Sequence, residues 1–428
     1  MSDALIVLLG DEVAGVLQRL PGGKLRFDYE RAYQERPAPT PLSLSMPIQV
    51  DSHSDRVVSP WLWGLLPDNR DVLRRWAREF EARAGSAFAL LATPIGEDCA
   101  GAVRFVPPEG LEAAQERRGN VAWLDEEAVG RRLRELRQDS TAWLGESFTG
   151  QFSLAGAQAK TALLHEDGRW GQPSGSIPTT HILKPGVGRL DEHDLDEHLC
   201  LDAARRAGLT AAHTDISRFA EESAVVVRRY DRAPGEAGTI RRVHQEDLCQ
   251  ALSVAPERKY ENDGGPGTAR IVRLLRESMP PAIAGESVAR FVDALIWNWL
   301  IGGTDAHAKN YSLLLAGDQV RLAPLYDVAS ALPYARSDRS LRLAMKIGGR
   351  YEAHPRRNPW PRTASELGLD GEALTTRTIE LAHAAPVAFA AAGAEDSVVA
   401  LESELPGRLA ELVTAHAERC LAVLERPG

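Results

Sequence analysis

The sequence predicts an α+β protein with two lobes, because its strands and its helices are largely segregated along the chain. Short apolar runs between turn residues fill much of the first half, as at 4–9 and 12–18. After residue 231 apolar residues recur mainly at helical spacing, as at 268–278 and 285–301. With 428 residues, the chain is long enough for two or three packed units, each with its own core.

Composition shifts and turn residues divide the chain into three expected domains. The first is a β-rich N-terminal subdomain, 1–108, which ends in the Pro/Gly cluster 107–110. The second, 109–232, is strand-rich after a helix at about 124–138, and one further helix, at about 194–207, interrupts its strands. The third, 233–428, is mostly helical.

Periodicity and turn residues predict the remaining elements. Expected helices are 68–83, 124–138, 245–254 and two long helices after 371. Expected strands are 24–29, 99–106, 151–165, 179–184, 213–219, 223–230, 311–315, 319–323 and 341–347.

Composition and charge exclude several classes of function. A formal net charge of −10 argues against tight, autonomous binding to nucleic acid, because neutralising phosphates needs a basic surface. The four cysteines form no C-x-x-C, so neither a zinc site nor a disulfide framework is predicted. The acidic start of the chain does not suit a signal peptide, and no apolar run approaches the ~18 residues of a membrane span. We therefore expect a cytoplasmic protein that does not enter membranes.

The segment Gly302-Gly303-Thr304-Asp305-Ala306-His307-Ala308-Lys309-Asn310 carries the strongest chemical pattern. Asp305 precedes Asn310 by five residues, which is the spacing between a catalytic base and a magnesium-binding amide in kinase catalytic loops. Asp327 follows an expected hairpin and adds a hard oxygen ligand. Each residue alone is more often a helix cap or a turn residue, whereas the ordered set favours phosphoryl transfer with ATP and Mg²⁺.

The segment 153–160, Ser-Leu-Ala-Gly-Ala-Gln-Ala-Lys, is made mostly of small residues, whose backbone amides can approach phosphate oxygens closely. With one glycine, it is more often a plain hairpin turn. Lys184 ends an expected strand and is a candidate ligand for the α- and β-phosphates, with Glu197 on the next helix as its candidate ion-pair partner. Both charges could instead be solvated at the surface.

Taken together, these motifs resemble the HipA family over nearly the whole chain. The resemblance rests on PLSLSMP at 41–47, FSLAGAQAKTALL at 152–164, HILKP at 181–185, EHLCLDAARRAGL at 197–209, VVRRYDR at 226–232, RVHQEDLCQAL at 242–252, KYENDGGPG at 259–267 and NWLIGGTDAHAKN at 298–310. It implies a bilobal protein-kinase-like fold with an added N-terminal β-rich subdomain and a mostly helical C-terminal lobe.

The resemblance also implies roles for single residues. Asp305 becomes the catalytic base, and Asn310 and Asp327 become the magnesium ligands. Ser153 matches a serine whose autophosphorylation displaces the loop, and few packed side chains are expected to oppose that exit. His307 lies where it would touch the transferring phosphate. The implied nucleotide-binding residues are Lys184, the phosphate loop Ala155, Gly156, Ala157 and Gln158, and the adenine hinge Arg228, Arg229 and Tyr230.

Two positions leave questions. Arg228 stands where the family pattern leads us to expect an acidic hinge residue, which changes the charge near adenine but not the backbone contacts. Lys259 and Tyr260 belong to a family motif whose chemical role the sequence does not reveal.

The resemblance implies a serine/threonine protein kinase toxin and its partners. These are a HipB-like helix-turn-helix antitoxin, operator DNA reached mainly through that antitoxin, and a protein substrate, for which an aminoacyl-tRNA synthetase is one candidate. Two alternatives stay open. A small-molecule phosphotransferase of the aminoglycoside or choline kinase type shares the D-x4-N pattern, and a pseudokinase could act as a corepressor without catalysis.

Overall fold

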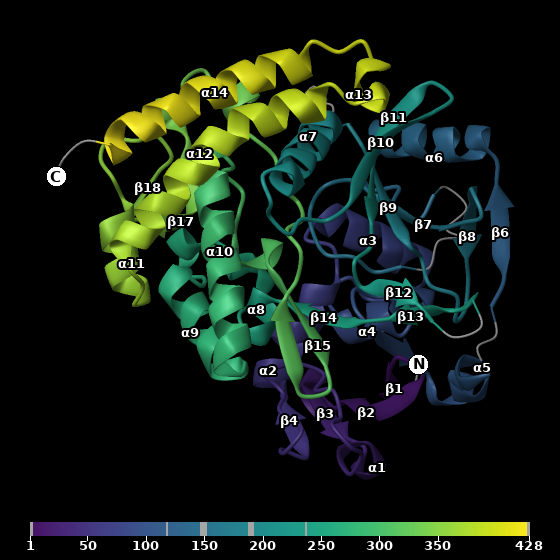
Figure 1. Cartoon of the computed structure of the whole chain (residues 1–428). Coiled ribbons are helices and arrows are strands. Elements are labelled where there is room, and N and C mark those ends of the chain that lie inside the picture. The colour runs from purple at the N-terminus through teal and green to yellow at the C-terminus, as the bar shows by residue number, and fades with distance from the viewer. Residues whose placement is uncertain (1–2, 117–118, 146–151, 187–191, 236–237, 426–428) are drawn as a thin grey trace. The chain divides into compact units, whose positions relative to one another are not determined.

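The computed structural model describes residues 3–116, 119–145, 152–186, 192–235 and 238–425. The chain forms two compact units, each assembled from three separate segments. Unit 1 comprises Met1–Pro185, Arg218–Glu257 and Ser312–Val320, and unit 2 comprises Gly186–Ser217, Arg258–Tyr311 and Arg321–Gly428. Strands predominate in unit 1 and helices in unit 2, which confirms the predicted α+β class (Figure 1).

An antiparallel five-stranded sheet begins unit 1. Its order is β4-β3-β2-β1-β5, formed by β1 (Ala4–Leu9), β2 (Glu12–Arg19), β3 (Leu25–Tyr29), β4 (Ser52–Ser54) and β5 (Val103–Val106). The predicted strands 4–9, 12–18 and 24–29 are confirmed, whereas the one expected at 99–106 begins only at Val103. The helices of this region are α1 (Arg31–Gln34), α2 (Asp55–Leu65), α3 (Arg70–Glu79), α4 (Ala87–Leu91) and α5 (Leu111–Gln115).

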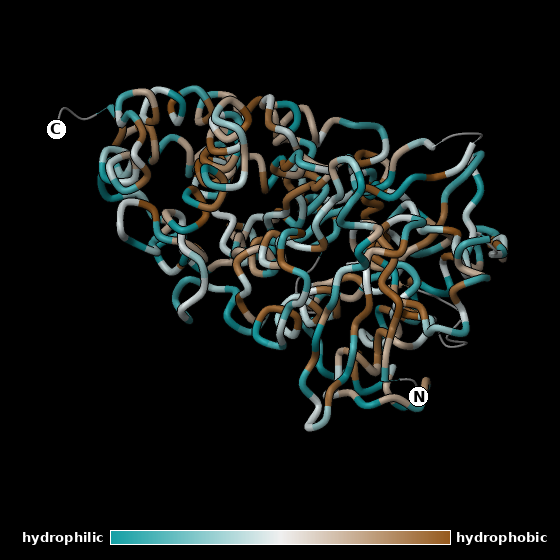
Figure 2. The backbone as a smooth tube through the Cα atoms, turned by 90° about the horizontal axis from the view of Figure 1, so that it is seen from below, coloured by the Kyte–Doolittle hydropathy of each residue, from teal (hydrophilic) through white to brown (hydrophobic). Residues whose placement is uncertain are grey.

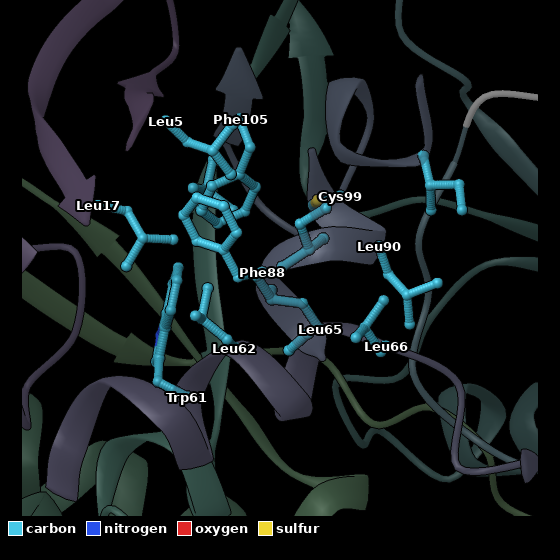
Figure 3. Packing of buried hydrophobic residues seen from close by; sticks show 14 of the residues in the cluster. Leu5, Leu17, Trp61, Leu62, Leu65, Leu66, Phe88, Leu90, Cys99 and Phe105 are labelled. Atoms are coloured by element: carbon cyan, nitrogen blue, oxygen red, sulfur yellow. The ribbon is translucent and has the colours of Figure 1, made fainter. Parts of the chain in front are cut away.

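One hydrophobic cluster joins this sheet to its helices. Figure 3 shows Phe88 at its centre, with Leu5 and Phe105 from the sheet on one side and Leu62 and Leu65 from α2 on the other. All five side chains are buried. The cluster therefore fixes the backbone at the end of α2, where the carbonyl of Leu65 lies.

A second antiparallel sheet of unit 1 contains five strands in the order β11-β9-β7-β8-β6. Its α6 helix buries Val129 and Leu133 against Leu163 and Leu183. Because side chains alternate along a strand, Lys184 points to the opposite face from Leu183. The bounds are β6 (Val121–Leu124), α6 (Glu126–Gln138), β7 (Thr161–Glu166), β8 (Arg169–Pro173), β9 (His181–Pro185), β10 (Thr214–Phe219) and β11 (Glu222–Arg228).

The strand expected at 151–165 is wrong in its first part. Residue 151 lies outside the described residues, and 152–160 form neither helix nor strand. The Ser153 amide donates to the Asp98 carbonyl, and the Gly156 carbonyl accepts from the Asp68 amide, so both groups bond to loops instead of to a neighbouring strand.

The helix expected at 245–254 is also wrong in its first part. His244–Asp247 forms strand β14, which pairs with β15 (Ser312–Ala316), and only Leu248–Ala251 is helical, as α8. Asp247 caps α8 with a reciprocal Gln250 contact, and this capping box fixes where the helix begins. The hairpin strands β12 (Arg232–Pro234) and β13 (Ile240–Arg242) precede β14.

Two distant motifs of unit 1 bind each other through β14. The Glu246 carboxylate accepts from Ser43 Oγ at 2.5 Å and from the Leu44 amide at 2.8 Å. A His244 ring nitrogen, Nε2, lies 2.9 Å from the Leu42 carbonyl oxygen. The HQED motif thus holds the PLSLSMP segment in place.

Unit 2 consists mainly of helices, with α12 and α14 side by side (Figure 1). Hydrophobic stretches along the chain alternate with hydrophilic turns (Figure 2). Among the described residues, no helix is both long and apolar enough to cross a bilayer. The bounds are α7 (His193–Arg206), α9 (Thr268–Ser278), α10 (Pro281–Ile301), β17 (Arg342–Ile347), β18 (Arg350–Glu352), α11 (Trp360–Leu367), α12 (Gly371–Gly393), α13 (Asp396–Val399) and α14 (Leu405–Leu424), while β16 (Gln319–Leu322) leads from unit 1 into unit 2.

A buried ionic network lies at the centre of unit 1. The Asp98 carboxylate, 2% exposed, meets Arg232 at 2.8 Å and both Arg229 and Arg242 at 3.2 Å. Asp231 pairs with Arg229 at 2.8 Å and with Arg232 at 3.0 Å. Burial alone would raise the pKa of Asp98, but the three arginines outweigh it and hold that pKa well below its usual range.

We expect Asp98→Asn to lower the free energy of unfolding by about 3–5 kcal/mol, because it leaves three buried arginines with the single carboxylate of Asp231. Since the folded-state pKa is depressed, this stabilisation is complete above the ordinary aspartate pKa of about 4 and is lost as the pH falls below it. Urea unfolding at pH 7 and at acidic pH measures both effects.

Asp71→Asn serves as the control, because its pair with Arg74 is exposed and such pairs contribute about 0–1 kcal/mol. Equal losses in the two variants at pH 7 would contradict the role given to Asp98.

Candidate active site

The polar loop predicted to be catalytic begins where the buried helix α10 ends. The last two turns of α10 are buried and apolar except for Asn298, and the chain turns away at Gly302. Asp305 is exposed, whereas His307 and Asn310 are buried, and Ala308–Asn310 forms a short 3-10 turn. The buried helix thus anchors a loop that presents one carboxylate to solvent.

Asn310 connects the two predicted acidic residues of unit 2. Its side-chain Nδ2 donates to the backbone carbonyl of Asp305 at 3.0 Å and to that of Asp327 at 3.4 Å. One amide group therefore holds the loop of the expected base beside the segment of the expected metal ligand. The structure brings Asp305, Asn310 and Asp327 together, as their order in the sequence suggested.

Asp327 adopts an uncommon backbone conformation, with φ of 57°, which asparagine and aspartate tolerate better than most residues. The residues after it are tied to the end of α10. Ser330 Oγ donates to the Ile301 carbonyl at 2.6 Å, and the Ala331 amide donates to the Gly302 carbonyl at 3.1 Å. Left-handed residues of this kind cluster at functional sites, where surrounding bonds maintain them.

The donor atoms of this site fit a magnesium ion. Nδ2 of Asn310 donates hydrogen bonds to two backbone carbonyls, so its Oδ1 is the side-chain atom suited to a cation. Asp327 adds a carboxylate. Mg²⁺ is usually held by one or two protein carboxylates together with water and substrate phosphates. Among the described residues there is no cluster of three or more His, Cys, Asp or Glu side chains suited to a metal, so a cage made only of protein ligands is not present there.

The predicted phosphate loop belongs to unit 1 and is held by its backbone. Lys160 Nζ donates to the Ala155 carbonyl at 2.8 Å, and the Asp68 amide donates to the Gly156 carbonyl at 2.9 Å. With φ of 105°, Gly156 has a conformation that favours glycine, and a Cβ there would lie 2.7 Å from Lys160 Nζ. These carbonyls bond to protein donors, an arrangement that suits a loop whose amides face an anion. Ala157 is exposed and Gln158 half-buried.

Ser153 begins this loop and is fully buried, with 0% exposure. Its Oγ donates to the Leu65 carbonyl at 2.8 Å, and its amide donates to the Asp98 carbonyl at 2.9 Å. The neighbouring Phe152 and Leu154 lie in the main hydrophobic cluster. The expectation that few packed side chains oppose the exit of Ser153 is therefore wrong.

Lys184 and Glu197 are both buried, with 5% and 1% exposure, so the alternative that they are solvated surface charges is wrong. Lys184 lies on β9 opposite Val225 of β11, in unit 1, while Glu197 lies on α7, in unit 2. Their ion pair stays a prediction.

The predicted adenine hinge follows β11. Arg228 ends that strand, and the Arg229 amide donates to the Thr180 carbonyl at 2.9 Å, which removes this amide from those that could contact adenine. The Arg229 side chain belongs to the buried network, and burial raises the pKa of Tyr230 above its usual range. Adenine contact at 228–230 stays a prediction.

Sequence reasoning missed three functional candidates. The KYENDGGPG motif was recognised, but not that the Tyr260 hydroxyl donates to Asp305 Oδ1 at 2.5 Å. Lys160 was quoted only as the last residue of the loop. The burial of Asp98 and its pairing with arginines were not predicted, because a single aspartate between Glu97 and Cys99 resembles any other acidic residue in the sequence.

Comparisons with known proteins agree with this geometry. A profile of the HipA-like C-terminal domain matches residues 152–389, and a profile of the HipA N-terminal domain matches residues 5–106. The Sinorhizobium fredii protein Y4mE, a kinase by name, is 33% identical over 92% of this chain and 93% of its own length. The serine/threonine-protein kinase toxin HipA of Shewanella oneidensis is 31% identical over 76% of each chain.

A solved structure covers nearly the whole chain. It is the complex of Shewanella oneidensis HipA with HipB and its operator DNA, with a TM-score of 0.81, 25% identity and coverage of 98% of both chains. The kinase-like fold that the resemblance implied is thereby confirmed. With both domain profiles matched in order and relatives aligned over most of their length, this chain belongs to the HipA family.

Proposed function

We propose that this chain is an ATP- and Mg²⁺-dependent serine/threonine protein kinase toxin that acts in the cytoplasm. The observation that carries the proposal is the Asn310 amide, which binds the carbonyls of both Asp305 and Asp327. A base and a metal ligand held together by a further oxygen ligand are the minimum that phosphoryl transfer needs. The names of the family relatives, a kinase toxin and a kinase, support the same activity.

In the proposed reaction, Asp305 accepts the proton of a serine or threonine hydroxyl. The hydroxyl oxygen forms a bond to the γ-phosphorus, and the bond from that phosphorus to the β–γ bridging oxygen breaks, so its electron pair leaves with ADP. Asp305 suits this role because its side chain is exposed while its backbone is fixed. When bound by Asn310 and Asp327, magnesium supplies positive charge to the phosphates.

Unit 1 would supply the nucleotide contacts. The loop 155–158 would bind phosphate through its amides, and Lys184 would bind the α- and β-phosphates. The hinge 228–230 would contact adenine through its backbone groups other than the Arg229 amide, which donates to the Thr180 carbonyl. His307 would touch the transferring phosphate.

We further propose that Ser153 is an autophosphorylation site that switches the kinase off. A phosphate adds roughly −1.5 to −2 charges, which cannot remain where Ser153 Oγ now donates to the Leu65 carbonyl in a fully buried position. Phosphorylation therefore requires Ser153 to leave.

Leaving also withdraws Phe152 and Leu154 from the core, at about 1.5–3 kcal/mol for each side chain. Each 1.4 kcal/mol changes the ratio of two populations about tenfold. The outward state would therefore hold less than about one in a hundred molecules of the unmodified chain. The phosphate would thus convert a rare state into the stable one.

The proposed partner is a HipB-like helix-turn-helix antitoxin, which brings the chain to operator DNA. The Shewanella oneidensis structure contains HipA, HipB and operator DNA, and this supports the proposal. The protein substrate belongs to the proposal only as a class, a protein with an accessible serine or threonine, for which an aminoacyl-tRNA synthetase is the candidate to test.

Asp305→Asn and Asp327→Ala should each reduce phosphoryl transfer at least about 100-fold, because one removes the base and the other a metal ligand. Labelled ATP and the purified protein measure autophosphorylation. Asp318→Asn, an exposed aspartate at the tip of the β15–β16 hairpin, is the matched control and should retain activity. Full transfer by either site variant would remove the assignment, and melting curves show whether the fold survives.

Mass spectrometry after incubation with Mg-ATP should find phosphate on Ser153, and Ser153→Ala should stay active for longer than the unmodified sequence. Ser153→Asp should weaken ATP binding, whereas Ser140→Asp, at an exposed position of unit 1, should not. Phosphorylated Ser153 with unchanged ATP affinity would disprove the switch.

In a gel-shift assay, the isolated chain should bind operator DNA weakly, because its formal charge is −10. Addition of a HipB-like helix-turn-helix protein, the proposed partner, should produce a ternary complex. Tight, sequence-specific binding by the isolated chain would contradict this division of roles.

A further inference from the structure

We infer that Tyr260 is a positioning residue that orients the carboxylate of Asp305, and that the surrounding KYENDGGPG motif exists to hold it there. This inference rests on the proposed function, in which Asp305 receives the proton of the substrate hydroxyl. It starts from one contact. The Tyr260 hydroxyl donates to Asp305 Oδ1 at 2.5 Å, within unit 2.

The aromatic ring of Tyr260 is fixed from two directions. The Tyr260 ring meets the His307 ring edge to face, with 4.8 Å between the two ring centroids. Lys259 Nζ lies 5.6 Å from the centroid of the Tyr260 ring. The motif is also joined to the catalytic loop by its backbone, because the Ala308 amide donates to the Lys259 carbonyl at 3.3 Å. Tyr260 and Asp305 are therefore linked through both side chains and main chain.

The glycines of the motif serve the backbone of Tyr260. Its carbonyl accepts from the amides of Asp263 at 3.1 Å and Gly265 at 2.9 Å, which closes a tight turn. A Cβ on Gly265 would lie 2.1 Å from the Arg258 carbonyl oxygen, so no other residue fits without moving the backbone. Glu261 anchors the turn to β17 by accepting from the Lys346 amide at 2.6 Å.

This geometry has a direct consequence for catalysis. An exposed aspartate can rotate about its side-chain bonds, and a general base must present one oxygen to the reacting hydroxyl. A donor on Oδ1 fixes the carboxylate plane and leaves Oδ2 to accept the substrate proton. Tyr260 touches neither substrate nor nucleotide in this role, and it acts through Asp305.

The test uses Tyr260→Phe in the full chain, which removes the hydroxyl and keeps the ring against His307. We expect kcat to fall about tenfold, the worth of a hydrogen bond to a charged group, while KM for ATP stays unchanged. Mg-ATP should raise the melting temperature of the variant as much as that of the wild type. A crystal structure of the variant should show the Asp305 carboxylate in more than one rotamer.

Tyr351→Phe is the matched control, since Tyr351 lies in unit 2 beside Lys346 and outside the site. Unchanged or raised kcat in Tyr260→Phe would overturn the inference, and so would a loss confined to KM or a carboxylate that keeps its single orientation. Absence of Mg-ATP binding and of phosphoryl transfer in the wild type would instead reject the proposed function. The two failures are therefore distinguishable.

Discussion

The buried carboxylate of Asp98 is the constraint on which unit 1 depends. Its charge is enclosed by three arginines, and Asp231 pairs with two of them, so removing the Asp98 carboxylate would leave three buried positive charges against the one negative charge of Asp231. Thr179, just before β9, also donates to this carboxylate, at 2.6 Å from its Oγ1. Because the Asp98 carbonyl receives the Ser153 amide, one residue fixes the start of the predicted phosphate loop and the segment after β11 together.

Unit 2 organises its site differently, through neutral hydrogen bonds. Backbone carbonyls of this site accept hydrogen bonds from the side-chain amide of Asn310, from Ser330 Oγ and from the backbone amide of Ala331. Each such bond contributes about 0.5–1.5 kcal/mol. These donors are uncharged, and they fix the backbone that carries Asp305 and Asp327. Ion pairs therefore stabilise the scaffold of unit 1, and uncharged amides and hydroxyls shape the acidic site.

The sequence predicted well whatever depends on local pattern. The helices 268–278 and 285–301 have clear apolar periodicity, and the five-residue offset from Asp305 to Asn310 predicted a loop, in which the Asn310 side chain binds the Asp305 backbone. Contacts between distant segments left no comparable pattern. The HQED motif was taken for helix because its pairing with β15 and its bonds to Ser43 and Leu44 involve residues about 70 and about 200 positions away. When a strand pairs with a segment so distant in the sequence, its local sequence does not distinguish it from the first turn of a helix.

The same distinction explains why the role of Tyr260 could not be read from its motif. Glycines and an acidic residue after an aromatic residue predict a turn. The residue that the Tyr260 hydroxyl contacts, Asp305, lies 45 residues later in the sequence. Ser153 is the opposite case, because its motif was recognised while its burial was not predicted. The small residues at 155–158 suggested a loose loop, whereas Phe152 and Leu154 anchor its beginning in the core. In the proposed switch, partial withdrawal of this loop would expose apolar surface without freeing Ser153, so the anchor favours two separate positions, inside or fully withdrawn.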